Sequence, residues 1–343
     1  EGTVVFPYEP LIRVRGPIIQ CQLVETAILN SVNFETLIAT KAARVCGVAK
    51  GPVAEFGLRR AQGPMGGNLA SRAAIVGGCA STSNTMAGKL FDLPVSGTHA
   101  HSWVMAHDDE LEAFRAYARV MPHNCILLVD TYDVLDGVRN AIIVALEMEQ
   151  RGQKLSGIRI DSGDLAWLSI QARDLLDEAG LDYVKIVASN DLDEYTIQSL
   201  HDQEACIDAW GVGTRLATAY DQPSLGGVYK LCATRVPGQR WTPSLKVSEQ
   251  VKKSTFPGVL EVRRYFDADG VMVGDMVYDQ NMPPRDDLII DPFDDLRRKD
   301  LSGKDHQELL VPLARKGKAI LSADETSAIR AQQRTLANLQ QLH

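Results

Sequence analysis

Polar side chains that could do chemistry occur in six short segments, each placed where an apolar run ends. They supply imidazole, carboxylate, guanidinium and hydroxyl groups beside glycines, a set that suits nucleophilic and acid–base catalysis. The segments are residues 56–60, 97–102, 130–133, 159–164, 189–191 and 211–214. In α/β barrels, the carboxyl ends of the parallel strands bring ligands and catalytic groups to one face. We therefore predict an enzyme in which these segments share one active-site mouth.

The sequence around these segments repeats a short apolar run followed by a stretch with helical periodicity. The expected strand and helix pairs are 53–56 with 69–90, 93–96 with 109–121, 125–129 with 135–150, 157–160 with 165–178, and 184–188 with 194–202, followed by strands at 205–212 and 227–232. Units of roughly 30 residues that alternate in this way favour right-handed crossovers and a parallel sheet. We predict an α/β fold with an incomplete, TIM-like β/α barrel over residues 51–240.

The two ends of the chain have a different pattern. Short strands are expected at 3–6, 10–14 and 18–22, then a helix at 23–45. After Pro243 the pattern indicates an antiparallel hairpin, 259–266 with 271–278, and a second pair of strands at 309–314 and 318–321. Ser322 and Glu325 match a capping box that would start a final helix ending near residue 339. Residues 1–50 and 241–343 are thus expected to form a second, smaller α/β domain built from both chain ends.

Composition excludes several classes of protein. The 343 residues carry 36 Lys and Arg against 44 Asp and Glu, a net charge of −8, which argues against nucleic-acid or membrane-surface binding. The six cysteines contain no C-x-x-C pair, so neither a disulfide framework nor a zinc site is expected, and no metal ligands are predicted. No apolar run approaches the roughly 20 residues of a membrane span. We expect reduced thiols and a cytoplasmic protein.

Each candidate residue also has a structural interpretation. Gly213 and Thr214 could form a tight strand-to-helix turn instead of a phosphate site, and the residues after Asp161 could cap the next helix. Arg59 and Arg60 could be solvated, although two arginines beside a glycine-rich stretch suit phosphate or carboxylate recognition. His99 and His101 alternate, so an extended segment would point only one of the two imidazoles into the pocket.

The same segments resemble the nicotinate phosphoribosyltransferase family. The matching motifs are Phe-Gly-Leu-Arg-Arg at 56–60, Gly-Thr-His-Ala-His-Ser at 97–102, Val-Asp-Thr-Tyr-Asp at 129–133, Ile-Arg-Ile-Asp-Ser-Gly-Asp-Leu at 158–165, Ala-Ser-Asn-Asp-Leu-Asp-Glu at 188–194 and Gly-Val-Gly-Thr at 211–214. Their order and spacing match over nearly the whole chain. Six ordered motifs are far more specific than any single turn, and the related nicotinamide enzymes share the layout.

The resemblance implies three catalytic residues. His101 would be the histidine that ATP phosphorylates, Asp130 the carboxylate that orients its ring, and Asp161 a carboxylate beside the ribose and the histidine. ATP is then a co-substrate, and Mg²⁺ the expected cofactor on the leaving pyrophosphate. A carboxylate near the ribose carbon also makes chemical sense, because loss of pyrophosphate leaves positive charge there.

The resemblance also implies a substrate-binding set for nicotinate and phosphoribosyl pyrophosphate. Phe56 would stack on the pyridine ring, and Asn84 stands where relatives that use nicotinamide carry Asp, which favours the acid as substrate. The remaining substrate-binding candidates are Arg59, Arg60, Thr98, Arg159, Ser189, Asn190, Gly213, Thr214 and Lys230, most of which would hold phosphate groups.

Family members assemble as homodimers with a shared active site, which is the expectation here. They normally begin with about a hundred further residues, including an aromatic near an Asp-x-Tyr motif, and nothing in this sequence matches them. We therefore expect a fragment, or a split or shortened form.

Other functions stay open at this point. Nicotinamide or quinolinate phosphoribosyl transfer is the nearest alternative, and a non-catalytic nucleotide-binding subunit is a second. A barrel aldolase or isomerase would need a Schiff-base lysine at a strand end, for which Lys230 is the obvious candidate.

Overall fold

The computed structural model describes residues 1–245 and 256–342, and the chain divides into two compact units. The barrel unit is Phe34–Leu225, and the terminal unit combines Glu1–Asn33 with Gly226–His343. The two boundaries lie earlier in the chain than positions 50 and 240, where the sequence pattern placed them. The first boundary falls within helix α2 (Glu25–Val48), whose buried side chains all belong to its second half.

The barrel unit is built on an open sheet of six parallel strands in the order β2-β1-β6-β5-β4-β3. The strands are β1 (Val53–Glu55), β2 (Ser81–Thr82), β3 (Ile126–Leu128), β4 (Gly157–Ile160), β5 (Lys185–Ser189) and β6 (Ala209–Val212). Strands β2 and β3 are the two edges and do not pair with each other, so the sheet does not close. The predicted incomplete β/α barrel is confirmed.

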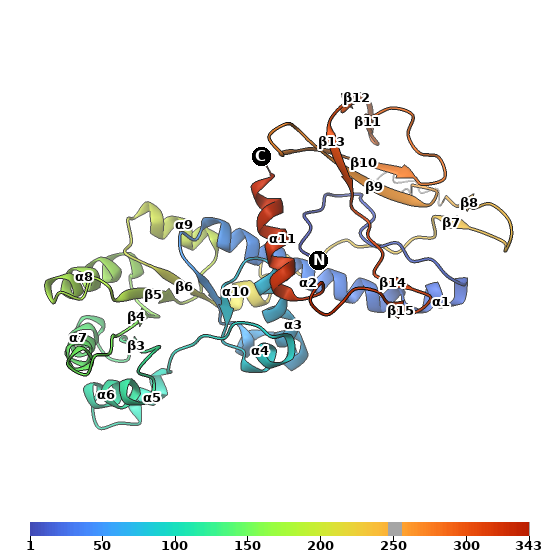
Figure 1. The fold of residues 1–343 in the computed structure, drawn as a ribbon. Coiled ribbons are helices and arrows are strands. Elements are labelled where there is room, and N and C mark those ends of the chain that lie inside the picture. Colours follow the sequence, from blue (N-terminus) through green and yellow to red (C-terminus); the bar gives the residue numbers. More distant parts are fainter. Residues whose placement is uncertain (246–255, 343) are drawn as a thin grey trace. The chain divides into compact units, whose positions relative to one another are not determined.

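Helices lie between these strands along the chain, from blue through green to yellow in Figure 1. They are η1 (Leu58–Arg60), α3 (Gly63–Val76), α4 (Thr85–Phe91), α5 (His101–Met105), α6 (Glu110–Val120), α7 (Val134–Gln150), α8 (Leu165–Glu178), α9 (Glu194–Asp202) and α10 (Thr214–Ala217). An aspartate caps the start of each of four helices, α6 to α9, by accepting a backbone N–H in the first turn. Strand β4 and helices α8 and α9 have the predicted bounds.

Three predictions for the barrel unit and its carboxyl end were wrong in detail. The expected helix 69–90 is two helices with strand β2 between them, because the chain reverses at Gly77 and Gly78, the latter with φ 122°. The expected strand 93–96 makes only one bridge, from Val95 to Thr82. Residues 227–232 do not form a strand. In each case a short apolar run was mistaken for a strand or for part of a helix.

The terminal unit contains antiparallel sheets. Strand β9 (Leu260–Phe266) pairs with β10 (Met272–Asp279) and with β13 (Asp305–Glu308), which confirms the predicted hairpin. The remaining elements are α1 (Ile18–Leu23), β7 (Ala233–Thr234), β8 (Thr242–Pro243), β11 (Leu288–Asp291), β12 (Asp294–Asp300), β14 (Ala314–Arg315), β15 (Lys318–Ala319) and α11 (Ala328–Gln340). Tyr265, Met276 and Leu301 form a buried apolar cluster within this unit.

Both chain ends do contribute to the terminal unit. The backbone N–H of Val4 donates to the side chain of Asn338 in α11 at 3.1 Å. The predicted strand 18–22 is instead helix α1, preceded by Pro17, and 3–6 and 10–14 form no strand. Proline at or just before the first helical residue is compatible with a helix start, a signal that the strand prediction ignored.

The predicted capping box exists but does not start the last helix. Ser322 and Glu325 exchange reciprocal hydrogen bonds around a turn, and α11 begins later, at Ala328, with Ser327 as its cap. Among helices of the described ranges, none has both the length and the apolar character that crossing a membrane requires.

Candidate active site

His101 lies beside two carboxylates at the carboxyl end of the parallel sheet. Its Nε2 atom is 3.9 Å from Oδ1 of Asp130 and 3.9 Å from Oδ2 of Asp161. The imidazole is 41% exposed, whereas the Asp130 side chain is completely buried. The ring can therefore meet a ligand from solvent while two negative charges lie on one side of it.

Asp130 is fixed in place through one of its two carboxylate oxygens. Its Oδ2 atom accepts hydrogen bonds from the Asp161 backbone N–H at 3.1 Å and from the Ser162 hydroxyl at 2.6 Å. Its Oδ1 atom is buried and has no hydrogen-bond partner among the residues that the structure describes. A buried carboxylate oxygen without a hydrogen bond is costly, so this atom is available to a cation or to a donor group of a bound ligand.

The hydrogen bond to the His101 ring comes from a residue that sequence analysis did not single out. Nδ1 of His101 lies 3.2 Å from the hydroxyl of Thr131, whereas Asp130 is beyond hydrogen-bond distance from the ring. A proton on Nδ1 would leave Nε2 as the nucleophilic nitrogen. Thr131 directly follows Asp130 in the segment after β3, so its position in the motif was the signal that could have identified it.

Arg159 joins the 97–102 segment to the ends of β4 and β5 through its side chain. Its Nη2 atom donates to Oδ1 of Asp161 at 3.0 Å, Nη1 to the Thr98 hydroxyl at 2.9 Å, and Nε to the Ser189 hydroxyl at 2.7 Å. The Ser189 hydroxyl in turn donates to Asp161. One guanidinium thus orients Asp161, whose second oxygen remains directed at His101.

The Phe56 ring lies under the same guanidinium. The centre of the Arg159 guanidinium is 5.3 Å from the ring centroid, a cation–π distance. Gly211 makes room for the ring, because a Cβ atom at that position would lie 2.7 Å from two atoms of Phe56. An aromatic face and a cation together suit a planar ligand that carries a carboxylate.

His99 is the buried histidine of the pair. Its Nε2 atom accepts the Leu128 backbone N–H at 3.1 Å, and its ring packs edge-on against Tyr117 with centroids 4.7 Å apart. Burial, with a smaller contribution from the nearby Arg159 charge, lowers the pKa of His99 to about 4. His99 therefore ties the segment before α5 to strand β3 as a neutral ring, while His101 faces outward.

The loops that carry the other phosphate candidates have unusual backbone conformations. Asn190, after β5, has φ 101°, and the next residue, Asp191, has φ 46°. Strained backbone of this kind is found most often at ligand sites. Gly213 follows β6 and precedes α10, which begins at Thr214. These two loops lie on neighbouring strands, because β5 pairs with β6.

Besides Phe56 and the residues of these two loops, Arg59, Arg60 and Asn84 form no hydrogen bond with the described members of this cluster. Arg59 and Arg60 are exposed in η1, and the structure shows no ion pair from either to a described residue. Asn84 is buried as the cap of α4, and its amide donates to Asn68 and Ser71, so its role in choosing between acid and amide stays a prediction. Lys230 belongs to the terminal unit.

Glu55 is a buried residue of this region that the sequence pattern did not reveal. Its carboxylate accepts hydrogen bonds from the Gly57 backbone N–H and from the hydroxyls of Ser71 and Thr82. It thereby fixes the turn that follows β1 and carries Phe56. A lone glutamate ending a short strand carries no signal in a single sequence.

A cavity of about 120 Å³ runs beside the sheet from Phe56 and Thr98 toward the strand starts. Most of its lining is apolar, with Val53, Ile126 and Val187 among the residues. No group of three or more His, Cys, Asp or Glu side chains in the described ranges is arranged to hold a metal ion. The polar chemistry is therefore concentrated at the mouth formed by the strand ends.

Comparisons with known proteins decide the family. A sequence profile of the nicotinate phosphoribosyltransferase (NAPRTase) family matches residues 52–256. The chain belongs to this family. The match includes the strand ends that carry Phe56, His101, Asp130, Arg159 and Asp161, and with this the resemblance found in the sequence is confirmed.

Curated nicotinate phosphoribosyltransferases are similar over much of the chain. The Bacillus subtilis enzyme is 53% identical over 266 residues, which cover 77% of this chain and 54% of the relative. The Caenorhabditis elegans enzyme is 39% identical over 360 residues, covering 87% of this chain and 63% of the relative. The chain thus spans between about half and two thirds of the length of these relatives.

A solved structure of the family has the same fold. The crystal structure of human nicotinic acid phosphoribosyltransferase matches 100% of this chain and 75% of its own, with a TM-score of 0.83 and 29% sequence identity. The open α/β barrel unit and the antiparallel terminal unit therefore both belong to an architecture known in this family.

Proposed function

We propose that this chain transfers the phosphoribosyl group of phosphoribosyl pyrophosphate to nicotinate, giving nicotinate mononucleotide and pyrophosphate in NAD salvage. Membership of the family and the names of its relatives support this reaction. The observation that carries the proposal is the cluster in which Asp161 is oriented by Arg159 and also faces His101.

Asp161 would stabilise the charge that develops during transfer. The bond between the ribose carbon and pyrophosphate breaks as the pyridine nitrogen forms its bond to that carbon, and positive charge builds up on the ribose in between. Asp161 is held by Arg159 and Ser189 through Oδ1, so Oδ2 can face this charge without reorganising. Electrostatic preorganisation of this kind is often the largest single contribution to a lower barrier.

Phe56 and Arg159 would bind the base. The Phe56 ring offers a face for stacking of the pyridine, and the guanidinium above it offers a cation for the nicotinate carboxylate. Nicotinamide lacks that negative charge. We therefore propose nicotinate, not its amide, as the preferred substrate.

ATP coupling would use His101 as a nucleophile. Nε2 would attack the terminal phosphorus of ATP while the bond to the ADP oxygen breaks, and the Nδ1 proton would stay hydrogen-bonded to Thr131. Hydrolysis of the phosphohistidine would release inorganic phosphate. The exposure of the imidazole, 41%, supports this role because a buried ring could not meet ATP.

Mg²⁺ fits the oxygen groups at the mouth as a partner of bound substrate. Asp130 Oδ1 lacks a hydrogen bond from a described residue, and Asp161 Oδ2 lies near the same imidazole nitrogen. Mg²⁺ is commonly held by one or two carboxylates together with substrate phosphates. When bound, it would neutralise charge on the leaving pyrophosphate. A homodimer with a shared site, and a cytoplasmic location, are part of the same proposal.

The direct test is product formation by the purified chain. Nicotinate, nicotinamide and quinolinate are each incubated with phosphoribosyl pyrophosphate and Mg²⁺, with and without ATP, and nucleotides are measured by chromatography. We expect nicotinate mononucleotide as the main product, at a rate that ATP increases. A preference for either other base would replace the proposed substrate, and no product from any base would favour a non-catalytic nucleotide-binding subunit.

A further inference from the structure

Two consecutive carboxylates at the start of α9 are each held by a cation from a different element. Asp193 contacts Arg215 in α10, and Glu194 contacts Lys41 in α2. Both residues follow directly on the Asn190 loop, and Arg215 follows directly on Thr214. The loops after β5 and β6, which carry the candidate phosphate-binding residues, are therefore followed directly by residues that form ion pairs.

The first pair is buried on its acidic side. The Asp193 side chain is 2% exposed, caps α9 by accepting the Thr196 backbone N–H at 2.8 Å, and receives Nη1 of Arg215 on its other oxygen. Burial would raise the pKa of Asp193, but its hydrogen bonds to Thr196 and Arg215 outweigh this and lower it. Arg215 also reaches Asp191, with Nε 3.7 Å from Oδ2. One arginine in α10 thus contacts two residues of the segment between β5 and α9.

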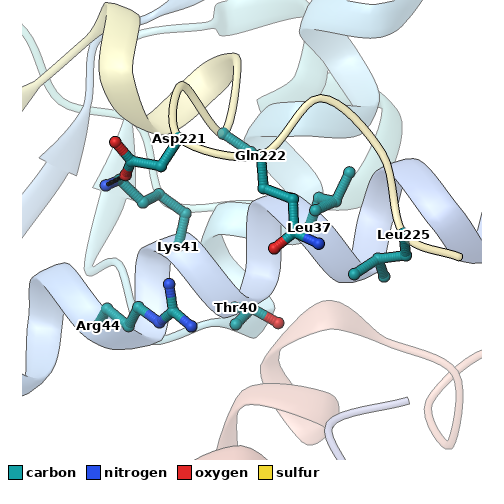
Figure 2. A pocket seen from close by; sticks show the side chains of 8 residues that line it. Leu37, Thr40, Lys41, Arg44, Asp221, Gln222 and Leu225 are labelled. Atoms are coloured by element: carbon teal, nitrogen blue, oxygen red, sulfur yellow. Dashed lines mark hydrogen bonds and ion pairs between the residues drawn. The ribbon is translucent and has the colours of Figure 1, made fainter. Parts of the chain in front are cut away.

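The second pair is a buried lysine that joins three segments. Lys41 is 4% exposed, and its Nζ atom lies 2.6 Å from Glu194 Oε2 and contacts Asp221, in the chain after α10. Figure 2 shows the Lys41 amine meeting the Asp221 carboxylate, with Arg44 and Thr40 on neighbouring turns of the same helix. The cavity beside them is only about 40 Å³, so the lysine is placed for holding structure and not for binding a substrate.

We propose that Arg215 and Lys41 are positioning residues that hold the loop after β5 and the loop after β6 in one fixed arrangement for the 5′-phosphate of phosphoribosyl pyrophosphate. This rests on the proposed function for the identity of the ligand. Asn190 and Asp191 have positive φ angles, a conformation that persists only where surrounding contacts impose it. Arg215 contacts Asp191 and Asp193, which flank Leu192. Lys41 contacts Glu194, the first residue of α9. Without these ion pairs the two loops would separate. The affinity for the 5′-phosphate would then fall, while the rate of the chemical step would change little.

Asp193→Asn is the most informative variant. Asparagine caps helices as well as aspartate does, so α9 keeps its cap while the charge that holds Arg215 is lost. The matched control is Asp109→Asn, which changes the cap of α6, where the aspartate accepts the Glu112 N–H at 2.8 Å and forms no ion pair with a described residue. Arg215→Met and the double variant with Asp193→Asn complete a double-mutant cycle for this ion pair. Asp221→Asn tests the ion pair between Lys41 and Asp221.

The measurements are the affinity for ribose 5-phosphate by calorimetry, and kcat and the two KM values in the nucleotide assay. We expect Asp193→Asn and Arg215→Met to weaken ribose 5-phosphate binding and raise KM for phosphoribosyl pyrophosphate roughly 10- to 100-fold, the scale of a misplaced positioning group. KM for nicotinate and kcat should change little. The double variant should bind ribose 5-phosphate no more weakly than the more affected of the two single variants, and Asp109→Asn should behave as wild type.

Several outcomes would overturn the proposal. These are unchanged phosphate affinity in folded Asp193→Asn and Arg215→Met variants, equal losses in both KM values, or no ribose 5-phosphate binding by the unaltered chain. Because binding is measured without turnover, a chain that binds ribose 5-phosphate but makes no nucleotide contradicts the proposed function and still tests the positioning role.

Discussion

The Nη2 atom of Arg159 donates a 3.0 Å hydrogen bond to Oδ1 of Asp161, two residues further along the chain. In a strand, residues two apart project from the same face, so β4 brings both side chains to one side of the sheet as the strand ends. This arrangement leaves Oδ2 of Asp161 directed toward His101, 3.9 Å from its Nε2 atom. The carboxylate is thus held by the scaffold and not by its reaction partner.

The first prediction concerns this carboxylate. Asp161→Asn keeps the shape of the side chain and an oxygen for Arg159, but removes the negative charge that the proposed mechanism places opposite the ribose. We expect the rate of nucleotide formation to fall on the order of 10²- to 10³-fold, the usual scale for losing one electrostatic group in a transition state. Initial rates measured without ATP isolate the transfer step. A rate close to wild type would mean that Asp161 does not stabilise the ribose.

The second prediction separates the two histidines. Incubation with γ-labelled ATP should produce a phosphoenzyme that is labile in acid and stable in base, and His101→Ala should abolish both the label and the stimulation by ATP. Some ATP-independent transfer should remain, because in the proposed mechanism the charge of Asp161 acts independently of His101. His99→Gln is the comparison variant, since its amide oxygen can still accept the Leu128 N–H. Loss of label in His99→Gln together with a labelled His101→Ala variant would assign the nucleophile to His99.

The barrel could be predicted from the sequence because its parallel strands are short apolar runs with polar residues at their ends. Strand β4 and helices α8 and α9 have the expected bounds, since a buried strand, an aspartate cap and a clear helical period coincide there. Strand β2 was missed because it is only two residues long and both of its residues, Ser81 and Thr82, are polar. No hydrophobic pattern marks such an element, and its place in the sheet depends on pairing with β1.

The site was predictable to the level of segments and less so to the level of contacts. The strand ends indicated which side chains would converge, and His101, Asp130, Arg159, Asp161 and Ser189 do form one cluster. The partner of each atom was not readable, because it depends on three-dimensional spacing. Thr131, not Asp130, bonds the His101 ring. Asn84 likewise turned out to cap a helix, a role that the wrong assignment of one long helix had hidden.

The third prediction concerns the space for the Phe56 ring. Gly211→Ala would place a Cβ atom 2.7 Å from two ring atoms, so the ring must move from its position under Arg159. We expect KM for nicotinate to rise roughly tenfold, with a smaller change in KM for phosphoribosyl pyrophosphate. The reason is that about 1–3 kcal/mol of overpacking strain would distort the proposed base site. Steady-state kinetics with each substrate varied in turn would measure this.

The control for that substitution is Gly47→Ala. Gly47 lies in α2 with open space around its Cβ position, so the same added methyl group meets nothing. It should leave both KM values unchanged and should increase helix stability, because alanine is the better helix former by about 1 kcal/mol. Equal KM values for Gly211→Ala and wild type would mean that Phe56 does not contact the base.

The last prediction concerns acid stability and follows from the buried imidazole of His99. Burial, with a further contribution from the Arg159 charge, lowers the pKa of His99 from 6.5 to about 4 in the folded chain. Between these two values the unfolded chain binds a proton that the folded chain does not, so the free energy of unfolding decreases as the pH falls through this window. The contribution is fully present above pH 6.5 and is lost by pH 4, and its size is about 3 kcal/mol at 1.36 kcal/mol per pH unit.

Urea unfolding of wild type and His99→Gln at pH 7.5, 5.5 and 4.5 would measure it, because all other titrating groups are common to both proteins. The variant should lose less stability than wild type on acidification, with the difference growing as the pH falls. Parallel pH dependences in the two proteins would show that His99 titrates normally and that its bond to Leu128 does not hold the segment before His101 in place.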